Sequence, residues 1–291
     1  MPPLTWTTRS LINRSLSLLC EHPVLVVPVG AADLLCFAAM HIQHALHQPL
    51  LAWVFGHSES VLASSRSAFV LTPQNAAEAA FLTVPLVWGC FFLTVCFYTG
   101  ALLMTSALVR KVGNSDLPDL RSAYVHVVTN RRRILRFSMA MFGALIIAAI
   151  VAGISISGSM KIPGFASVAG RDLGYLIALP LEIALVYLLT RPALTLLSEA
   201  QNPPAGAILH TAKLFGFVTV SGQWVLVLLI EHSAPAFLFQ QKTVFGFLVR
   251  EAIVSLIAAS TYVPLFIGLS LLANRTQQTR PFSGAETVEE S

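Results

Sequence analysis

The chain has 291 residues, of which 55% are hydrophobic and only 11% are charged. A soluble domain carries roughly 25% charged residues, because it must cover its surface in water. The low charge therefore excludes an ordinary water-soluble enzyme, and the high hydrophobic content excludes a disordered chain. The four cysteines form no CxxC pair, so we expect neither a disulfide scaffold nor a zinc site. The composition predicts a multi-pass membrane protein.

Six apolar segments are long enough to span a bilayer, which takes about 20 mostly apolar residues. They run over residues 24–46, 79–109, 134–157, 173–198, 214–239 and 252–273. We predict that they form an all-α polytopic membrane bundle. Residues 1–273 then make a single integral membrane domain, and residues 274–291 form a disordered polar tail.

The distribution of Lys and Arg predicts the orientation, because cytoplasmic loops of membrane proteins carry an excess of both. With six spans, 13 of the 18 cations fall on the side that holds both termini. We therefore expect the protein in the cell membrane (inner or plasma), with both termini in the cytoplasm. A cleaved signal peptide is the alternative for the N-terminus. The first apolar run begins only at Val24 and contains Asp33, which favours a retained span.

The loop between the second and third spans carries the densest positive charge. The cluster at the two ends of this loop comprises Arg110, Lys111, Arg131, Arg132, Arg133 and, just inside the third span, Arg136. A cation near an anionic leaflet gains about 1 kcal/mol, so we predict that this loop contacts anionic phospholipid headgroups. The same cations set the topology, and the more specific alternative is a phospholipid-binding site at this cluster. The lipid bilayer is the expected partner, nucleic acid is not expected, and the sequence predicts no particular protein partner.

Amphipathic segments precede the first, third and fifth spans. Apolar residues recur at helical spacing within residues 10–21, 120–128 and 205–213, with polar residues opposite. Asp116 to Asp119 is a good helix opening for the second of these segments. Such helices suit the headgroup plane, so we predict three cytoplasmic in-plane helices, each followed by a transmembrane hairpin. The alternative is that short cytoplasmic loops are amphipathic by chance.

The runs Leu11–Leu19 and His22-Pro23, and later Arg191–Leu194 and Pro204–Ile208, resemble a bacterial membrane family. The family comprises the membrane domain attached to some glycerophosphodiester phosphodiesterases and its stand-alone relatives. The resemblance covers most of residues 9–273 and implies a six-helix bundle. In the fused members the catalytic barrel is a separate soluble domain. We see no room for one in this chain, so we do not expect phosphodiesterase activity.

Ionisable residues inside a bilayer are costly and are therefore functional candidates. Asp33 in the first span and Glu182 in the fourth could each bind a proton or a cation. Arg191 is a candidate partner for the carboxylate of another span. The alternative is a packed bundle in which buried polar pairs fix the register of the helices.

Histidines suggest two further candidates near the outer interface. Glu231-His232 could act as a proton relay, although a helix end at the interface is favoured. His41 and His44 are one turn apart and could share a metal ion. No carboxylate or cysteine completes that set nearby, so we expect neither a metal nor another cofactor. Interfacial side chains are the favoured interpretation.

The sequence contains no GxSxG, HExxH, Walker A or GxGxxG motif. The leading prediction is therefore a non-enzymatic membrane protein, either a scaffold or a lipid-associated factor. A transporter or channel that uses Asp33 and Glu182 is the first alternative. A membrane-embedded lipid enzyme is the second.

Overall fold

The computed structural model describes residues 7–54, 73–159, 170–198, 206–233 and 260–275. Within these ranges the ordered elements are helices and no strand is present, which confirms the predicted all-α class. The helices are α1 (Thr8–Glu21), the 3-10 helix η1 (Pro23–Val26), α2 (Val27–Val54), α4 (Pro73–Gly113), α5 (Leu120–Thr129), α6 (Arg131–Ser159), α7 (Gly170–Ser198) and α8 (Gly206–Ser233), followed by a helical segment over residues 260–275.

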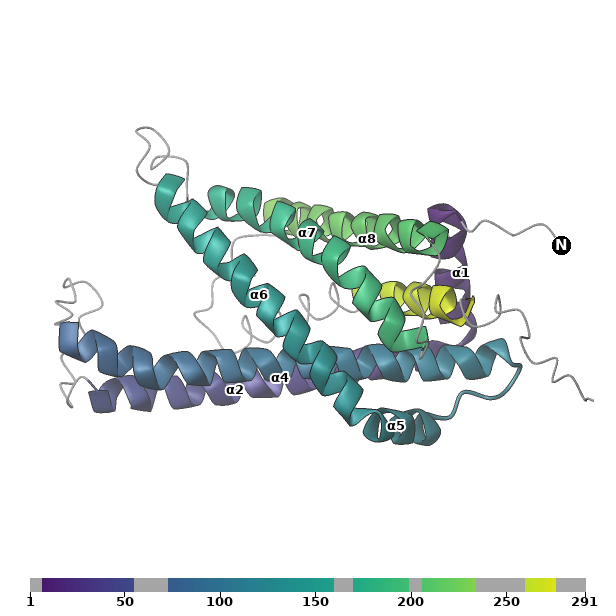
Figure 1. Cartoon of the computed structure of the whole chain (residues 1–291), viewed down its shortest axis with the longest axis horizontal. Helices are drawn as coiled ribbons and strands as arrows, with labels where there is room; N and C mark the ends of the chain where they lie inside the picture. Colours follow the sequence, from purple (N-terminus) through teal and green to yellow (C-terminus); the bar gives the residue numbers. More distant parts are fainter. Residues whose placement is uncertain (1–6, 55–72, 160–169, 199–205, 234–259, 276–291) are drawn as a thin grey trace, which may run out of the picture.

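The long helices form two groups that converge at one end (Figure 1). α2 and α4 lie side by side along much of their length. α6 crosses from α4 to α7, and α7 packs against α8. α1 contacts η1 and α8, and the segment 260–275 lies between the two groups at the same end (Figure 1).

Each of the six predicted spans overlaps a helix, but the helices differ in length and apolarity. Two stretches within the described residues are long and apolar enough to cross a membrane, Pro23–Gln43 and Val84–Gly113. The structure therefore gives two candidate spans, and the count of six stays a prediction. Residues 234–239 and 252–259 of the last two predicted spans lie outside the described residues. The predicted tail begins at residue 274, whereas the last helix continues to residue 275.

The break between α1 and α2 follows from local chemistry. The side chain of Thr7 caps α1 by accepting a hydrogen bond from the N–H of Ser10 at 3.2 Å. At the other end His22 precedes Pro23 and adopts φ −133° and ψ 75°, because a residue before proline is disfavoured in the helical region. The chain then re-enters a helix through η1. The apolar residues Leu11 and Leu18 of α1 are buried, as their spacing predicts.

A tight turn reverses the chain after α4. The N–H of Asp116 donates to the carbonyl of Lys111 at 3.0 Å, and the N–H of Ser115 donates to that of Val112 at 3.1 Å. This pair of bonds is the Schellman arrangement that ends many helices. Ser115 has φ 63°, in the left-handed region that glycine usually occupies there. The turn points α5 back toward the body of α4.

α5 runs back along α4, and this corrects the prediction that it lies across the bundle end in the plane of the headgroups. Asp119 at its start lies beside Lys111, and Val127 near its end lies 3.9 Å from the Cβ position of Gly100. Ala123 between them is buried. The amphipathic pattern therefore reports a helix packed on α4, with its second face exposed.

The third predicted in-plane helix is also corrected. Residues 206–213 form the first turns of α8, which continues without interruption to Ser233. The amphipathic pattern is real, because Ala212 is buried while His210 is exposed. However, the predicted boundary between Lys213 and Leu214 carries no helix stop signal, so the backbone hydrogen bonds of the helix continue through it.

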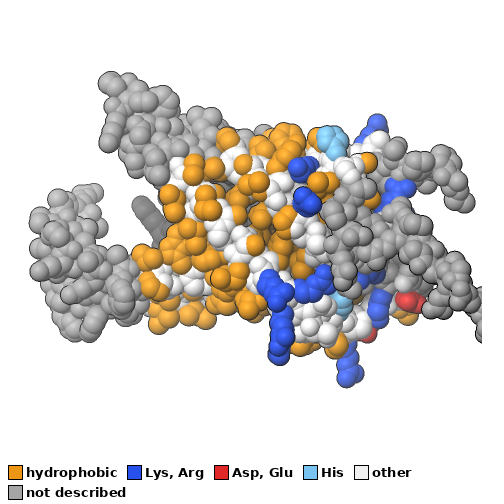
Figure 2. Space-filling model, in the orientation of Figure 1, with side chains coloured by type: hydrophobic (Ala, Val, Ile, Leu, Met, Phe, Trp, Pro, Cys, Tyr) orange, Lys and Arg blue, Asp and Glu red, His pale blue; other side chains and the backbone are white. Residues whose placement is uncertain are grey.

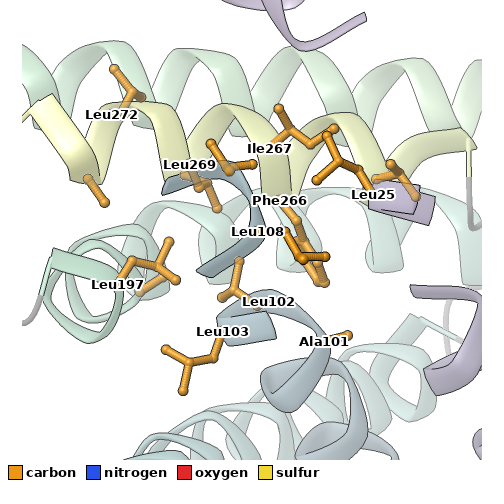
Figure 3. Close-up of a cluster of buried hydrophobic side chains, with 14 of the residues drawn as sticks. Leu25, Ala101, Leu102, Leu103, Leu108, Leu197, Phe266, Ile267, Leu269 and Leu272 are labelled. Atoms are coloured by element: carbon orange, nitrogen blue, oxygen red, sulfur yellow. The ribbon is translucent and has the colours of Figure 1, made fainter. Parts of the chain in front are cut away.

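The hydrophobic core lies at the end where the helices converge. Figure 3 shows side chains from α4, α7 and the segment 260–275 pointing toward one another around Leu102, Leu197 and Ile267. Leu25 of η1 and Phe215 of α8 belong to the same cluster. We call this region the packed end. Two glycines allow close approach here: a Cβ on Gly268 would stand 2.3 Å from the Phe215 ring, and one on Gly216 would stand 2.6 Å from Val186.

The remaining halves of the helices expose apolar side chains. On the face in Figure 2, hydrophobic atoms cover the part away from the packed end. The exposed set includes Leu34, Ile42, Val87, Phe91, Ile147, Ile150, Leu188 and Val225. We call this region the apolar end. There the α4–α6 crossing is held by aromatic contacts, with the Phe142 ring 5.2 Å from Phe92 and 5.9 Å from Trp88.

Candidate functional site

Asp33, the first of the predicted intramembrane carboxylates, is joined to another helix. The hydroxyl of Tyr98 in α4 donates a hydrogen bond to the carboxylate of Asp33 in α2. Both residues are half-buried. The ring of Tyr98 lies 5.1 Å from that of Tyr262, which in turn lies 6.0 Å from the Phe266 ring. The pair thus connects three elements, α2, α4 and the segment 260–275.

Packing on both sides holds this pair in place. Val29, Ala32 and Cys36 of α2 are buried at helical spacing around Asp33, and Leu34 on the opposite face is exposed. The Cys36 thiol lies within hydrogen-bonding reach of the Thr94 side chain of α4. An uncompensated carboxylate in an apolar setting is costly, and the phenol offsets part of this cost. The contact can fix the register of α2 against α4, and it can hold a proton or a cation.

Tyr98 was missed in the sequence, where it stands among apolar residues and reads as a core aromatic. A buried Tyr hydroxyl usually finds a polar partner, so a Tyr within an apolar helix is itself a signal. That signal does not name the partner, because Asp33 lies 65 positions away along the chain.

The other predicted intramembrane residues are not brought to Asp33. Glu182 lies within α7, but its side chain is outside the described set, so a site shared with Asp33 stays a prediction. Arg191 is exposed near the end of α7, and the structure gives it no carboxylate partner among the described residues. Glu231 and His232 lie in the last turn of α8, and their side chains are also outside the description.

The histidine hypothesis receives no support from the described side chains. His41 is exposed and packs edge-on against Phe37, with ring centroids 4.2 Å apart. The side chain of His44 lies outside the description. Among the described residues, no three His, Cys, Asp or Glu side chains lie close enough to hold one metal ion.

The predicted basic cluster separates into two groups. Arg110 and Lys111 are half-buried and tie α4 to α5: Arg110 Nη2 lies 3.2 Å from His126 Nε2, and Lys111 Nζ lies 3.8 Å from Asp119 Oδ2. Asn130 completes this junction by donating from Nδ2 to the carbonyl of His126 at 2.9 Å. These two cations therefore have structural roles at the α4–α5 junction.

Asp119 is the anion of that junction and the N-cap of α5. It accepts hydrogen bonds from the N–H groups of Arg121 and Ser122 at 3.0 and 3.1 Å. Partial loss of hydration acts to raise the pKa of the Asp119 carboxyl. The hydrogen bonds and the charge of Lys111 outweigh it and hold the pKa below its ordinary value.

The second group remains on the surface. Arg131, Arg132 and Arg136 are exposed at the start of α6, while Arg133 is half-buried. Arg121 of α5 is exposed as well, and the outer face of α5 between these cations is apolar. An arginine surface mixed with exposed apolar side chains suits an anionic, partly apolar ligand rather than a solvated protein face.

No protein-family model, curated protein or solved structure matches the chain. The family resemblance seen in the sequence stays a prediction.

Proposed function

We propose that the chain is a non-enzymatic, multi-pass protein of the cell membrane, a lipid-associated scaffold that holds its packed end at the cytoplasmic face. In this proposal six helices cross the bilayer, and both termini lie in the cytoplasm. The observation that carries it is the one-sided placement of charge: the described Lys and Arg side chains gather toward the packed end, while the exposed side chains of the apolar end are hydrophobic. On the face in Figure 2, Lys and Arg side chains lie toward the packed end and hydrophobic side chains cover the apolar end.

Side-chain contacts between α6 and α4 and between α4 and α2 show which residues of the three helices lie at the same depth in the proposed membrane. Ser138 of α6 donates to Thr99 of α4 at 3.1 Å, and the neighbouring Tyr98 contacts Asp33. Arg136 lies two residues before Ser138, so Arg136, Tyr98 and Asp33 lie within about one helical turn of the same level. Arg136 is the last cation along α6, and the exposed side chains that follow it, such as Met139 and Ile147, are apolar. We place the cytoplasmic edge of the hydrocarbon layer here.

α7 and α8 support the same edge. Lys213 of α8 lies over the ring of Tyr187 in α7, 5.3 Å from its centroid, and Arg191 follows one turn after Tyr187. Tyrosine and cations are enriched at membrane interfaces, where the ring meets the headgroups and the charge stays in water. Beyond this group the described exposed side chains of both helices are apolar, for example Ala184 of α7 and Val225 of α8.

The helix lengths beyond this edge match a bilayer, whose hydrocarbon core is about 30 Å thick. At about 1.5 Å per residue, α2 extends roughly 32 Å from Asp33 to Val54. α6 extends roughly 35 Å from Arg136 to Ser159, and α8 roughly 30 Å from Lys213 to Ser233. This agreement supports α2, α6 and α8 as spans.

This register argues against the transporter alternative. A transport site built on Asp33 needs the carboxylate near the middle of the bilayer, where binding sites of transporters lie. With the edge at Arg136, Asp33 stands at the border of the hydrocarbon layer, and its oxygen already accepts from Tyr98. The geometry favours a register contact between α2 and α4.

Cysteine scanning of α6 tests the proposal in intact cells and in inverted vesicles. Cys20, Cys36, Cys90 and Cys96 are first replaced by serine or alanine to give a cysteine-free background. A membrane-impermeant maleimide should label Arg132→Cys and Arg136→Cys only from the cytoplasmic side. It should not label Ile147→Cys or Ile150→Cys, because these exposed positions would face lipid.

A buried position provides the matched control. Ser138→Cys should stay unlabelled from both sides, because Ser138 is fully buried against α4. Labelling of Ile147→Cys from either aqueous side would overturn α6 as a span. Labelling of Arg132→Cys from outside the cell would overturn the orientation. So would a reporter fused to the C-terminus that proved to lie outside the cell.

A further inference from the structure

The exposed faces of α5 and of the first two turns of α6 meet at Asn130 and form one surface, the α5–α6 elbow. Its apolar members are Tyr124, Val125, Val128 and Leu135, which are 62%, 54%, 45% and 53% exposed. Its cations are Arg121, Arg131, Arg132 and Arg136, all exposed. On α5 the members recur at i, i+3, i+4 and i+7, and on α6 at i, i+1, i+4 and i+5, so each set lies on a single helix face.

The elbow cannot bury its apolar side chains by rolling α5 over. Ala123 on the inner face is 1% exposed, and Val127 packs beside Gly100 of α4. The Lys111–Asp119 pair fixes the start of α5, and the Arg110–His126 contact fixes its later turns. The described structure therefore presents the outer face of α5 in a set orientation without covering it.

The charge of the elbow is not compensated locally. The segment from Leu120 to Arg136 contains no acidic residue. The carboxylate of Asp119, just before it, accepts from the backbone N–H groups of Arg121 and Ser122 and lies beside Lys111. The C-terminal end of α5 lies beside Gly100, close to the level of the proposed hydrocarbon edge. The complement to such a surface is an anionic group attached to an apolar body.

We infer that the α5–α6 elbow binds anionic phospholipid headgroups of the cytoplasmic leaflet. The arginine guanidinium groups pair with phosphate oxygens, which they match in bidentate geometry. Tyr124, Val125 and Val128 enter the boundary between headgroups and acyl chains. This inference rests on the proposed function, because the elbow must face the cytoplasmic leaflet, and it adds a lipid class and a site.

Native mass spectrometry of the purified full chain in neutral detergent tests the inference. The protein is titrated with phosphatidylglycerol or with phosphatidylcholine, and the number and affinity of bound lipids are compared. The wild type should bind phosphatidylglycerol more tightly than phosphatidylcholine. Arg131→Gln/Arg132→Gln should weaken that binding about 20-fold or more, at roughly fivefold per arginine, the equivalent of about 1 kcal/mol each. Tyr124→Ser/Val125→Ser should weaken it as well.

Two comparisons separate this site from general charge attraction and from free phosphate. Arg9→Gln/Arg14→Gln removes two exposed cations of α1 and should leave the preference unchanged. An equal loss in this pair would overturn a site at the elbow. Inorganic phosphate should not displace the lipid at millimolar concentration. Displacement by phosphate, together with no effect of Tyr124→Ser/Val125→Ser, would instead identify a free-anion site.

The outcome is distinguishable from failure of the proposed function. If the cysteine scan gives the expected topology and the wild type binds both lipids equally, only the inference on the elbow fails. If the scan places Arg132 outside the cell, the proposed function fails whatever the lipid preference.

Discussion

Asp119 shows how one carboxylate can position a helix. It caps the first turn of α5 through two backbone N–H groups and lies within ion-pair distance of Lys111 at the end of α4. The sequence predicted a helix opening within Asp116–Asp119, with a capping-type residue and an early proline, but it did not single out Asp119 as the cap. It did not predict Lys111 as the partner, since that contact depends on the Schellman turn at Ser115.

The pH dependence of stability should reveal this role. The folded-state pKa of Asp119 lies below its unfolded value of about 3.9, so its contribution is complete above that value. It is lost as the pH falls through the folded pKa. We expect Asp119→Ala to have a lower Tm than the wild type at pH 7, and the difference to shrink below about pH 4.

Thermal unfolding of both proteins in detergent, followed by circular dichroism, provides the measurement. Asp119→Asn is the control, because asparagine also caps helices but does not titrate. A difference between wild type and Asp119→Ala that stays constant from pH 7 to pH 3 would contradict the assignment.

At the scale of elements, helix starts and stops were predictable where the chain carries a local signal. Pro23 ends α1, and Asn130 separates α5 from α6, where the chain supplies an alternative hydrogen-bond partner. Near Lys213 no such signal exists, and the predicted separate helix became the start of α8. The direction of α5 was not predictable, because it depends on contacts of Arg110 and Lys111 with residues that follow the turn.

Hydropathy alone could not separate a lipid-facing helix from a core helix. The apolar stretch Val84–Gly113 of α4 reads as a single span. The structure divides it: Val84, Val87 and Phe91 are exposed, whereas Leu102, Leu103 and Leu108 are buried by other helices. A helix that is apolar all round can be buried in protein or in lipid, and only its neighbours decide between the two.

The contact between Gly268 and Phe215 should be sensitive to a single methyl group. A Cβ at position 268 would overlap the Phe215 ring, which is itself 1% exposed and cannot move into solvent. Overpacking of this kind costs about 1–3 kcal/mol, against a gain of about 1 kcal/mol in helix propensity. We expect Gly268→Ala to lower the Tm, as measured by thermal unfolding in detergent.

Gly222 in α8 offers the matched control, since a Cβ there meets no atom within 4 Å. Gly222→Ala should leave the Tm unchanged or raise it. The double variant Gly268→Ala/Phe215→Leu should recover part of the loss, because leucine vacates the space that the ring fills. Equal effects of both glycine substitutions would refute the steric argument.

At the scale of the whole molecule, the two ends bury their apolar side chains in different ways. The core around Leu102, Leu197 and Ile267 is buried by protein and needs no bilayer. The apolar end exposes its side chains and depends on lipid or detergent to cover them. Hydrogen exchange should therefore separate the two ends.

We expect amides of α4 near Leu103 and Leu108 to exchange slowly in both detergent and lipid nanodiscs, as measured by mass spectrometry of peptides. Amides of α6 from Met139 to Val151 should exchange faster in detergent than in nanodiscs, because detergent or lipid rather than protein covers the exposed side chains there, and a detergent layer admits water more readily than a bilayer. The peptides that cover these two regions of α4 and α6 serve as controls for each other. Equal sensitivity of both regions to the change of environment would contradict the division.

Because α4 is one continuous helix, a change in its tilt within the membrane is transmitted to the packed end. The only internal proline of α4 is Pro85, so between Tyr98 and Gly113 the helix crosses from the proposed hydrocarbon edge into the packed end without a hinge. That distance is roughly 22 Å, so a tilt of about 10° in the bilayer moves Gly113 sideways by roughly 4 Å. A bilayer that thins or thickens would thereby turn the packed end relative to the membrane surface, and α5 would turn with it.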